Sequence, residues 1–553
     1  MKIALLQMNT TVGDIPGNVK KITEGYRRAV HEGAQVVVTP ELAITGYPPR
    51  DLVYRKTFIS NNLVALELLE DQMLKDSALV VGYIEPNLTG AGAPFFNAAA
   101  VLEAGKPISR RFKTCLPMYD VFDESRYFEP ATSNEPVEIL GHQVGVTICE
   151  DIWTSDFLPR TLYRINPVKH LASKKVSLIL NLSASPYFIG KEGLRQKMLS
   201  AVAKETGAAI AYCNLVGGND DLIFDGQSRA FNKHGHCIAL GAAFKEDFII
   251  TSVQDSIPLS FKPGPIDENL FNALVLGLRD YVSKCGFRTV VLGLSGGIDS
   301  AVVAAIAAEA VGPSNVTGVS LPSSYSSQGS LDDARILAEN LGINYDVVSI
   351  EEPFTSIKAT MSKVFAGRSA DLTEENMQAR LRGVVLMSLS NKFGHMLLTT
   401  GNKSEMSVGY CTLYGDMCGG LSVISDVLKM QVYSLARWIN ERHGANWQKG
   451  IPIPADTLTK PPSAELRPDQ KDQDSLPPYE VLDQILKGYV EENLSRQEIA
   501  AMGIDPIVVD EICRKVDFAE YKRKQAAPGL KVTPLAFGTG RRIPIAQKFK
   551  ERL

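Results

Sequence analysis

The sequence lacks any long hydrophobic run. Across its 553 residues, no window approaches the ~18 to 20 uninterrupted apolar residues that a membrane span requires. The apolar run at the N-terminus is broken by Gln7 and Asn9 before it reaches the length of a signal peptide's apolar region. We therefore expect a cytoplasmic protein without a membrane partner.

An excess of positive charge is also absent. Lys and Arg together number 58 against 62 Asp and Glu, which gives a formal net charge of -4. Such a chain has no global basic field to attract nucleic acid or an anionic membrane surface. We expect no nucleic-acid partner, and any anionic ligand must be held by local groups.

Cysteine motifs typical of disulfide frameworks or zinc sites are missing. The 8 cysteines form no CxxC pair, and none has a histidine at zinc-ligand spacing. A cysteine that stays reduced can instead act as a nucleophile, so the neighbours of each cysteine have to be considered separately.

The composition that remains is that of an ordinary globular protein, with 45% hydrophobic and 22% charged residues. Short apolar runs alternate with helical stretches over the first ~255 residues, which predicts a layered α/β domain. The segment QDSIPLSFKPGPIDE then interrupts regular structure. We predict a first domain at 1–255, a linker at 256–268 and a second domain at 269–553, where strands and helices alternate as in a doubly wound parallel sheet.

A glycine-rich turn follows the first predicted strand of the second domain. Its residues are Gly293, Leu294, Ser295, Gly296, Gly297, Ile298, Asp299 and Ser300. Backbone N–H groups, two hydroxyls and a helix N-terminus suit a bound phosphate, although a glycine turn without a ligand is the simpler alternative. The turn is neither a Walker loop nor a GxGxxG motif. An aspartate beside phosphates needs a cation, so we interpret Asp299 as a magnesium ligand. The SGGIDS segment resembles the pyrophosphate-binding loop of the ATP pyrophosphatase group, which implies ATP-dependent adenylation.

Cys149 lies at the end of a predicted strand, HQVGVTI, where a side chain can reach a cleft. A buried core cysteine is the ordinary alternative. Glu41 and Lys113 occupy comparable strand-end positions and can converge on the thiol. This set resembles the nitrilase superfamily of carbon-nitrogen hydrolases, which implies Glu41 as general base, Lys113 as oxyanion donor, Cys149 as nucleophile and Glu124 as the second glutamate.

Almost the whole chain resembles the glutamine-dependent NAD synthetase family. Further motifs agree: LPSSYSSQGSLDDA, EENMQARLRG, LLTTGNKSE, LYGDMCGG and KPPSAELRPDQKDQD. The resemblance implies an N-terminal α-β-β-α sandwich that releases ammonia from glutamine, and a Rossmann-like domain that amidates deamido-NAD with ATP and Mg²⁺ in the final step of NAD biosynthesis. It also implies a homo-oligomer.

The resemblance assigns further site residues. It places Tyr119, Ser185 and Lys191 at glutamine, and Thr400 with the Gly293–Ser300 turn at ATP. Asn376, Arg380, Glu405 and Lys522 are placed at deamido-NAD, and Asp299 with Glu405 at the metal. Surface charge is the plain alternative for Arg380 and Lys522.

Two other functions stay open at this point. One is an amidotransferase of the same architecture that acts on another adenylated acceptor, such as a tRNA, although the near-neutral charge weighs against tRNA. The other is a regulatory protein whose degenerate amidase senses glutamine. The presence of Glu41, Lys113 and Cys149 argues against degeneration.

Overall fold

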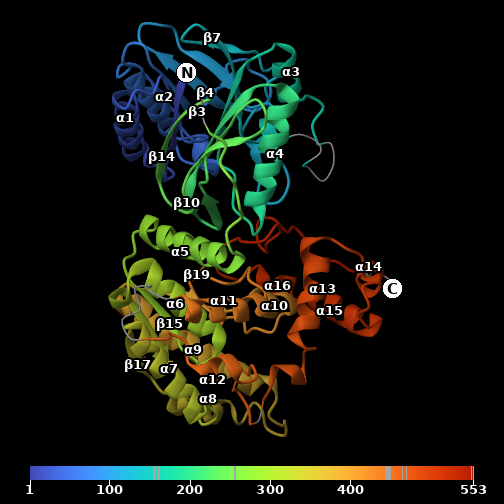
Figure 1. The fold of residues 1–553 in the computed structure, drawn as a ribbon. Helices are drawn as coiled ribbons and strands as arrows, with labels where there is room; N and C mark the ends of the chain where they lie inside the picture. The colour runs from blue at the N-terminus through green and yellow to red at the C-terminus, as the bar shows by residue number, and fades with distance from the viewer. Residues whose placement is uncertain are drawn as a thin grey trace. The chain divides into compact units, whose positions relative to one another are not determined.

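The chain forms two compact units, Met1–Gly264 and Pro265–Leu553 (Figure 1). The structure is a computed structural model that describes residues 1–153, 157, 162–253, 257–442, 450–463, 465–468, 470–549 and 551. The boundary predicted between 255 and 256 lies outside the described residues. The first helix of the second unit, α5 (Ile266–Lys284), begins within the predicted linker.

The first unit contains two mixed sheets. One has the order β14-β1-β2-β3-β4-β5 and the other the order β13-β12-β9-β8-β7-β6. The strands of the first sheet are β1 (Lys2–Gln7), β2 (Val36–Val38), β3 (Ala78–Pro86), β4 (Phe95–Glu103), β5 (Ser109–Phe112) and β14 (Asp247–Ser252). Those of the second are β6 (Val137–Ile139), β7 (His142–Ile148), β8 (Leu178–Ser183), β9 (Ala209–Asn214), β12 (Arg229–Phe231) and β13 (Cys237–Leu240). A separate hairpin pairs β10 (Val216–Asn219) with β11 (Leu222–Asp225).

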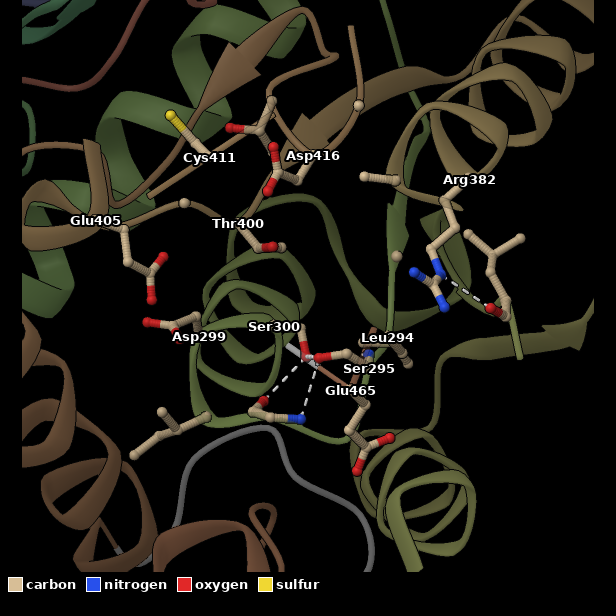
Figure 2. A pocket seen from close by; sticks show the side chains of 18 of the residues that line it. Leu294, Ser295, Asp299, Ser300, Arg382, Thr400, Glu405, Cys411, Asp416 and Glu465 are labelled. Carbon is tan, nitrogen blue, oxygen red and sulfur yellow. Dashed lines mark hydrogen bonds between the residues drawn. The ribbon is translucent and has the colours of Figure 1, made fainter. Parts of the chain in front are cut away.

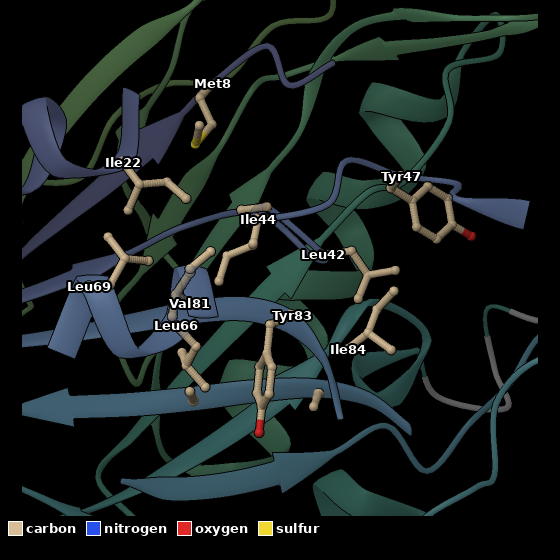
Figure 3. Close-up of a cluster of buried hydrophobic side chains, with 14 of the residues drawn as sticks. Met8, Ile22, Leu42, Ile44, Tyr47, Leu66, Leu69, Val81, Tyr83 and Ile84 are labelled. Atoms are coloured by element: carbon tan, nitrogen blue, oxygen red, sulfur yellow. The ribbon is translucent and has the colours of Figure 1, made fainter. Parts of the chain in front are cut away.

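Helices cover the outer face of each sheet. Helices α1 (Ile15–His31) and α2 (Lys56–Glu70) lie against the first sheet, and Figure 3 shows Ile22 and Leu66 directed towards Val81. Helices α3 (Pro167–Ser173) and α4 (Lys191–Thr206) pack against the second sheet. A third apolar cluster, which includes Leu5 and Leu180, lies between the two sheets. This layering confirms the expected α-β-β-α sandwich, because each apolar face is buried against another layer.

The second unit is built on a parallel sheet of order β17-β16-β15-β18-β19. The chain passes from the central strand β15 outward to β16 and β17, and then returns to the other side of β15 to form β18 and β19. Such a reversal leaves a crevice at the carboxyl ends of the two strands that flank it, here β15 and β18. The strands are β15 (Val290–Gly293), β16 (Val316–Ser320), β17 (Asn344–Val347), β18 (Met396–Thr399) and β19 (Leu421–Ser422).

Helices lie on both faces of this sheet, which confirms the predicted doubly wound architecture. Helices α6 (Ile298–Val311) and α7 (Gln328–Leu341) contact each other and β16. Helices α8 (Glu351–Met361) and α9 (Leu372–Phe393) contact each other, and α9 lies against β15 and β18. Helix α11 (Lys429–Glu441) packs on α5 and α6.

Shorter helices complete the unit. They are α10 (Lys403–Val408), α12 (Ala455–Thr459), α13 (Tyr479–Leu486), α14 (Arg496–Ala500), α15 (Pro506–Phe518) and α16 (Glu520–Arg523). The Pro- and Asp-rich stretch from 451 to 480 carries α12, a 3-10 helix at Asp472–Asp474 and the first residues of α13, and most of its described remainder is irregular. Among the described residues, no helix combines the length and hydrophobicity needed to cross a membrane.

Candidate active sites

In the first unit, Glu41 follows the carboxyl end of β2, where the chain turns sharply. The turn crosses Gly82 of β3 so closely that a Cβ there would lie 2.4 Å from the backbone nitrogen of Leu42. Only glycine leaves room for this approach. The Glu41 side chain is fully buried, so its carboxylate is fixed inside the sandwich.

Lys113 follows β5 and connects Glu41 to Glu124. Its Nζ lies 2.7 Å from Oε1 of Glu41, and 2.9 Å and 2.8 Å from the two oxygens of Glu124. The Tyr47 hydroxyl donates a further 2.7 Å hydrogen bond to Glu124. An ammonium between two carboxylates, all buried, is a preorganised charged set of the kind that catalysis requires.

Cys149 is the first residue after β7 and has a φ of +44°. Non-glycine residues seldom adopt this conformation, and functional sites are where such strain concentrates. Asp151 fixes the turn because its carboxylate accepts the backbone N–H groups of Ile148, Thr114 and Cys115. One side chain therefore ties the cysteine turn to the segment that carries Lys113.

Burial and neighbouring charges shift the pKa values of the ionisable groups in this cluster. Burial and the Glu41 carboxylate raise the pKa of the Cys149 thiol well above its usual value. Burial alone would lower the pKa of Lys113, but the Glu124 and Glu41 carboxylates raise it well above its usual value. Burial also raises the pKa of Glu124 to about 7, although Lys113 opposes that shift. At neutral pH the thiol is thus protonated and Lys113 is charged, so the thiol needs a base before it can attack.

The residues predicted at glutamine gather beside this cluster. Tyr119 donates a 2.8 Å hydrogen bond from its hydroxyl to Glu150, and Tyr163 donates one of 3.2 Å to the same oxygen. Lys191, at the start of α4, donates to the carbonyl of Pro186 at 2.6 Å, and its charge acts on Glu150. Ser185 donates its backbone N–H to Asn214. The set places a carboxylate and an ammonium next to the cysteine turn.

In the second unit, the Gly293–Ser300 turn joins β15 to α6 at the reversal of strand order. Gly296 has a φ of +76°, and a Cβ there would lie 2.3 Å from the carbonyl oxygen of Ser330. The Ser300 hydroxyl donates to the Gly297 carbonyl at 2.9 Å, and Ser295 accepts the N–H of Gly297 at 3.2 Å. The turn is thus held open at the N-terminus of α6, in the form that phosphate-binding turns take.

A cavity of about 330 Å³ opens beside the turn. Every residue of the turn except Gly296 lines it, as do Thr400 after β18 and Glu405 on α10. Figure 2 shows the carboxylates of Asp299 and Glu405 next to each other on one side of the cavity, with Arg382 and Glu465 on the other. A volume of this size suits a small-molecule ligand.

Lys429 lies between these two carboxylates. Its Nζ is 2.5 Å from Asp299 and 3.1 Å from Glu405. Asn402 donates a 2.8 Å hydrogen bond to the other oxygen of Asp299. Burial raises the pKa of Glu405 to about 7 against the opposing charge of Lys429.

Asp299 and Glu405 also suit a metal ion that is shared with phosphates. Among the described residues, no group of three or more His, Cys, Asp or Glu side chains is placed to hold a metal. Mg²⁺ is commonly bound by one or two carboxylates, and substrate phosphates and water supply its other ligands. The two carboxylates at the phosphate turn match this pattern.

The three remaining residues predicted at deamido-NAD converge on one segment. Asn376 accepts a 2.7 Å hydrogen bond from the Thr412 hydroxyl, and Arg380 donates to the carbonyl of Leu413. Lys522 donates to the carbonyls of Gly409 and Cys411, each at 2.7 Å. These residues hydrogen-bond to the segment between α10 and β19, and that segment lines the cavity.

Comparisons with known proteins agree with both halves of the chain. The family described as carbon-nitrogen hydrolase matches residues 2–257, and the family described as NAD synthase matches residues 270–526. A glutamine-dependent NAD(+) synthetase from Synechocystis sp. is 47% identical over 558 residues, with 99% of each chain covered. One from Thermotoga maritima is 44% identical, and both chains are covered completely.

The chain belongs to the glutamine-dependent NAD(+) synthetase family. The structure of the glutamine-dependent NAD+ synthetase from Acinetobacter baumannii in complex with ADP matches 100% of this chain and 99% of its own, at 40% identity and a TM-score of 0.76. That of the enzyme from Cytophaga hutchinsonii matches in fold, with a TM-score of 0.82 at 23% identity.

Three residues that the structure of this chain places at the two sites were not predicted from the sequence. They are Glu150, beside the cysteine; Lys429, between the two carboxylates; and Glu465, at the cavity. Glu150 follows Cys149 directly, which was the signal for it in the sequence. No sequence motif around Lys429 indicates a site residue. It is the first residue of α11, a helix with many polar residues, and it contacts Asp299 only in the folded chain.

Proposed function

We propose that this chain makes NAD⁺ from deamido-NAD, using ATP for activation and glutamine as the source of nitrogen. The observation that carries the proposal is that one chain holds both a buried Glu41, Lys113 and Cys149 set and a phosphate turn at a sheet reversal. Its relatives are named for this overall reaction. We assign glutamine hydrolysis to the domain at 1–255 and synthesis to the domain at 269–553.

In the first step, Glu41 takes the proton of the Cys149 thiol as the sulfur attacks the side-chain amide carbon of glutamine. Lys113, 2.7 Å from Glu41, stabilises the oxyanion of the tetrahedral intermediate. Glu41 then returns the proton to the departing nitrogen, and ammonia leaves a thioester on Cys149. Water, deprotonated by Glu41, hydrolyses the thioester to glutamate. Glu124 forms the second ion pair of Lys113 and helps to hold its ammonium in place.

The amino-acid end of glutamine carries one positive and one negative charge. We assign its α-ammonium to Glu150 with Tyr119, and its α-carboxylate to Lys191 with Ser185. The opposite charges of Glu150 and Lys191 beside the cysteine support this assignment. A neutral amide of the same length but without these charged ends would bind weakly.

In the second unit, the carboxylate of deamido-NAD attacks the α-phosphorus of ATP and pyrophosphate leaves. Ammonia then attacks the acyl-adenylate and displaces AMP, which gives NAD⁺. We assign the ATP phosphates to the Gly293–Ser300 turn with Thr400, and deamido-NAD to the neighbourhood of Asn376, Arg380, Glu405 and Lys522. Asp299 and Glu405 would hold Mg²⁺, which neutralises phosphate charge when it is bound.

The test is to supply the purified chain with ATP, Mg²⁺, glutamine and deamido-NAD. We expect NAD⁺, AMP, pyrophosphate and glutamate in equal amounts, and NAD⁺ also when ammonium replaces glutamine. Absence of NAD⁺ with both nitrogen sources would refute the proposal. A cytoplasmic location and a homo-oligomeric state remain predictions, the second of which light scattering of the purified chain would test.

A further inference from the structure

Asn97 lies directly beside the general base of the first unit. It is on β4, where it pairs with Ile84 of β3, and it is 0% exposed. Its Nδ2 donates a 2.7 Å hydrogen bond to Oε1 of Glu41. The sequence motifs did not include this residue.

The same oxygen of Glu41 accepts the Lys113 ammonium at 2.7 Å, and the other oxygen accepts the backbone N–H of Ala184 at 3.0 Å. Three donors from three separate segments thus surround one carboxylate. Lys113 and Ala184 each hold one oxygen, and the Asn97 amide gives Oε1 a second donor from strand β4, which adds to the restraint on the carboxylate.

Asn97 also holds the second charged group. Its backbone carbonyl accepts the N–H of Lys113 at 2.8 Å, which extends the pairing of β4 with β5 by one residue. A single residue therefore fixes the carboxylate of Glu41 through its side chain and the backbone of Lys113 through its main chain.

Only the donor half of the Asn97 amide is satisfied. Within the described residues its Oδ1 is buried without a hydrogen-bond partner. A buried acceptor without a partner destabilises the folded state, whereas an apolar residue of similar size carries no such cost. Polar groups kept in a core at the expense of stability are characteristic of functional sites.

We propose that Asn97 is a positioning residue for glutamine hydrolysis, which orients the Glu41 carboxylate so that it can take the Cys149 proton. The inference rests on the proposed function of the first unit. Partners that orient a catalytic ligand or base typically change activity 10- to 100-fold when they are lost.

The main variant is Asn97→Leu, which fills the same space without polar atoms. We expect its glutaminase kcat to fall about 100-fold, with the KM for glutamine changed less than about threefold. The melting temperature should change little, because removal of the unpaired Oδ1 offsets loss of the hydrogen bond to Glu41. Ammonium-supported NAD⁺ synthesis should be unchanged.

Asn62 provides a matched control. It is also 0% exposed, but both its hydrogen bonds go to the backbone of Ile84, the residue that pairs with Asn97. We expect Asn62→Leu to lower the melting temperature and to leave the kcat of the folded enzyme unchanged. Asn97→Leu should thus lower kcat without a loss of stability, whereas Asn62→Leu should lower stability without a change in kcat.

Asn97→Asp keeps the shape and decides the matter if Asn97→Leu does not fold. The titratable groups that face this position are Glu41, Lys113, Glu124 and the neutral Cys149 thiol, and the Tyr47 hydroxyl lies beyond Glu124. An introduced carboxylate cannot donate to Glu41, whereas its protonated form can. The glutaminase rate relative to the unmodified enzyme should therefore be low at pH 8 and recover as the pH falls.

Unchanged glutaminase kcat at pH 8 in either folded Asn97 variant would overturn the inference, even if the proposed function holds. A uniform loss of both activities in Asn97→Asp, with no dependence on pH, would also overturn it, because Asn97 would then be structural. If the unmodified enzyme hydrolyses no glutamine, the proposed function of the first unit fails instead.

Discussion

The two units place the same charged set in different surroundings. In each, a buried lysine lies between two carboxylates: Lys113 between Glu41 and Glu124, and Lys429 between Asp299 and Glu405. The side chains of Glu41 and Glu124 are 0% and 6% exposed, whereas those of Asp299 and Glu405 are 18% and 17% exposed and border a cavity.

This difference shows what each set can do. A fully enclosed set keeps its geometry and suits chemistry that repeats on one small substrate. A set with one side open to a cavity can share its carboxylates with an incoming ligand, as a site for phosphates and a cation requires. Similar residues thus give a fixed site in one unit and an adaptable site in the other.

The strongest test of this separation is Cys149→Ala. We expect glutamine-supported NAD⁺ synthesis to fall by about 10⁴-fold or more, since no other group replaces the thioester-forming sulfur. Ammonium-supported synthesis should persist at its normal rate, because the phosphate turn is untouched. Measuring NAD⁺ with each nitrogen source checks this, and loss of both activities in a folded variant would show that the two sites do not work separately.

The second test compares Lys113→Met with Lys429→Met. Removing the cation from an enclosed pair of carboxylates should cost about 3–5 kcal/mol of local stability, because buried charge is left uncompensated. The loss around Lys429 should be smaller, since Asp299 and Glu405 are partly exposed and border a cavity from which water can solvate them. Hydrogen exchange measured separately for each unit reports these values. Equal losses would mean that the two sets are equally closed.

The third test uses the pH dependence of Glu124. Its pKa is raised to about 7 in the folded protein, so the folded state holds a proton that the unfolded state releases above about pH 4.5. Stability from this group is therefore present at low pH and lost as the pH rises towards 7. Relative to the unmodified protein, Glu124→Gln should gain about 2 kcal/mol of unfolding free energy between pH 5 and pH 8. If the difference in unfolding free energy between Glu124→Gln and the unmodified protein did not change with pH, the raised pKa would not belong to Glu124.

Sequence patterns brought out residues that the fold gathers, because these residues lie at or near strand ends. Lys113 and Cys149 come directly after strands and Glu41 three residues after one, and the phosphate turn is continuous in the chain. Their catalytic roles stay predictions. Asn97 and Lys429 could not be found this way, since each meets its partners only across a long sequence separation. Helix α12, with five residues, is too short to show a hydrophobic period.

The smallest expected effect concerns Glu465, which fastens the 451–480 loop to the open site. Its carboxylate accepts the backbone N–H and the hydroxyl of Ser327 at the start of α7, and the hydroxyl of Ser330 at 2.7 Å. Ser327 is the N-cap of α7, so Glu465 holds the capping residue of the helix whose Ser330 lies against Gly296 of the phosphate turn.

Glu465→Ala should therefore raise the KM for ATP by about three- to tenfold, because ATP binding must then order the loop that Glu465 holds in advance. We expect little change in kcat and none in glutaminase activity, since Glu465 belongs to the second unit. Glu480→Ala is a suitable control, because Glu480 is an exposed residue in the first turn of α13. If both variants gave the same KM for ATP as the unmodified enzyme, the loop would be held by other contacts, such as that of Lys460 with Asp333.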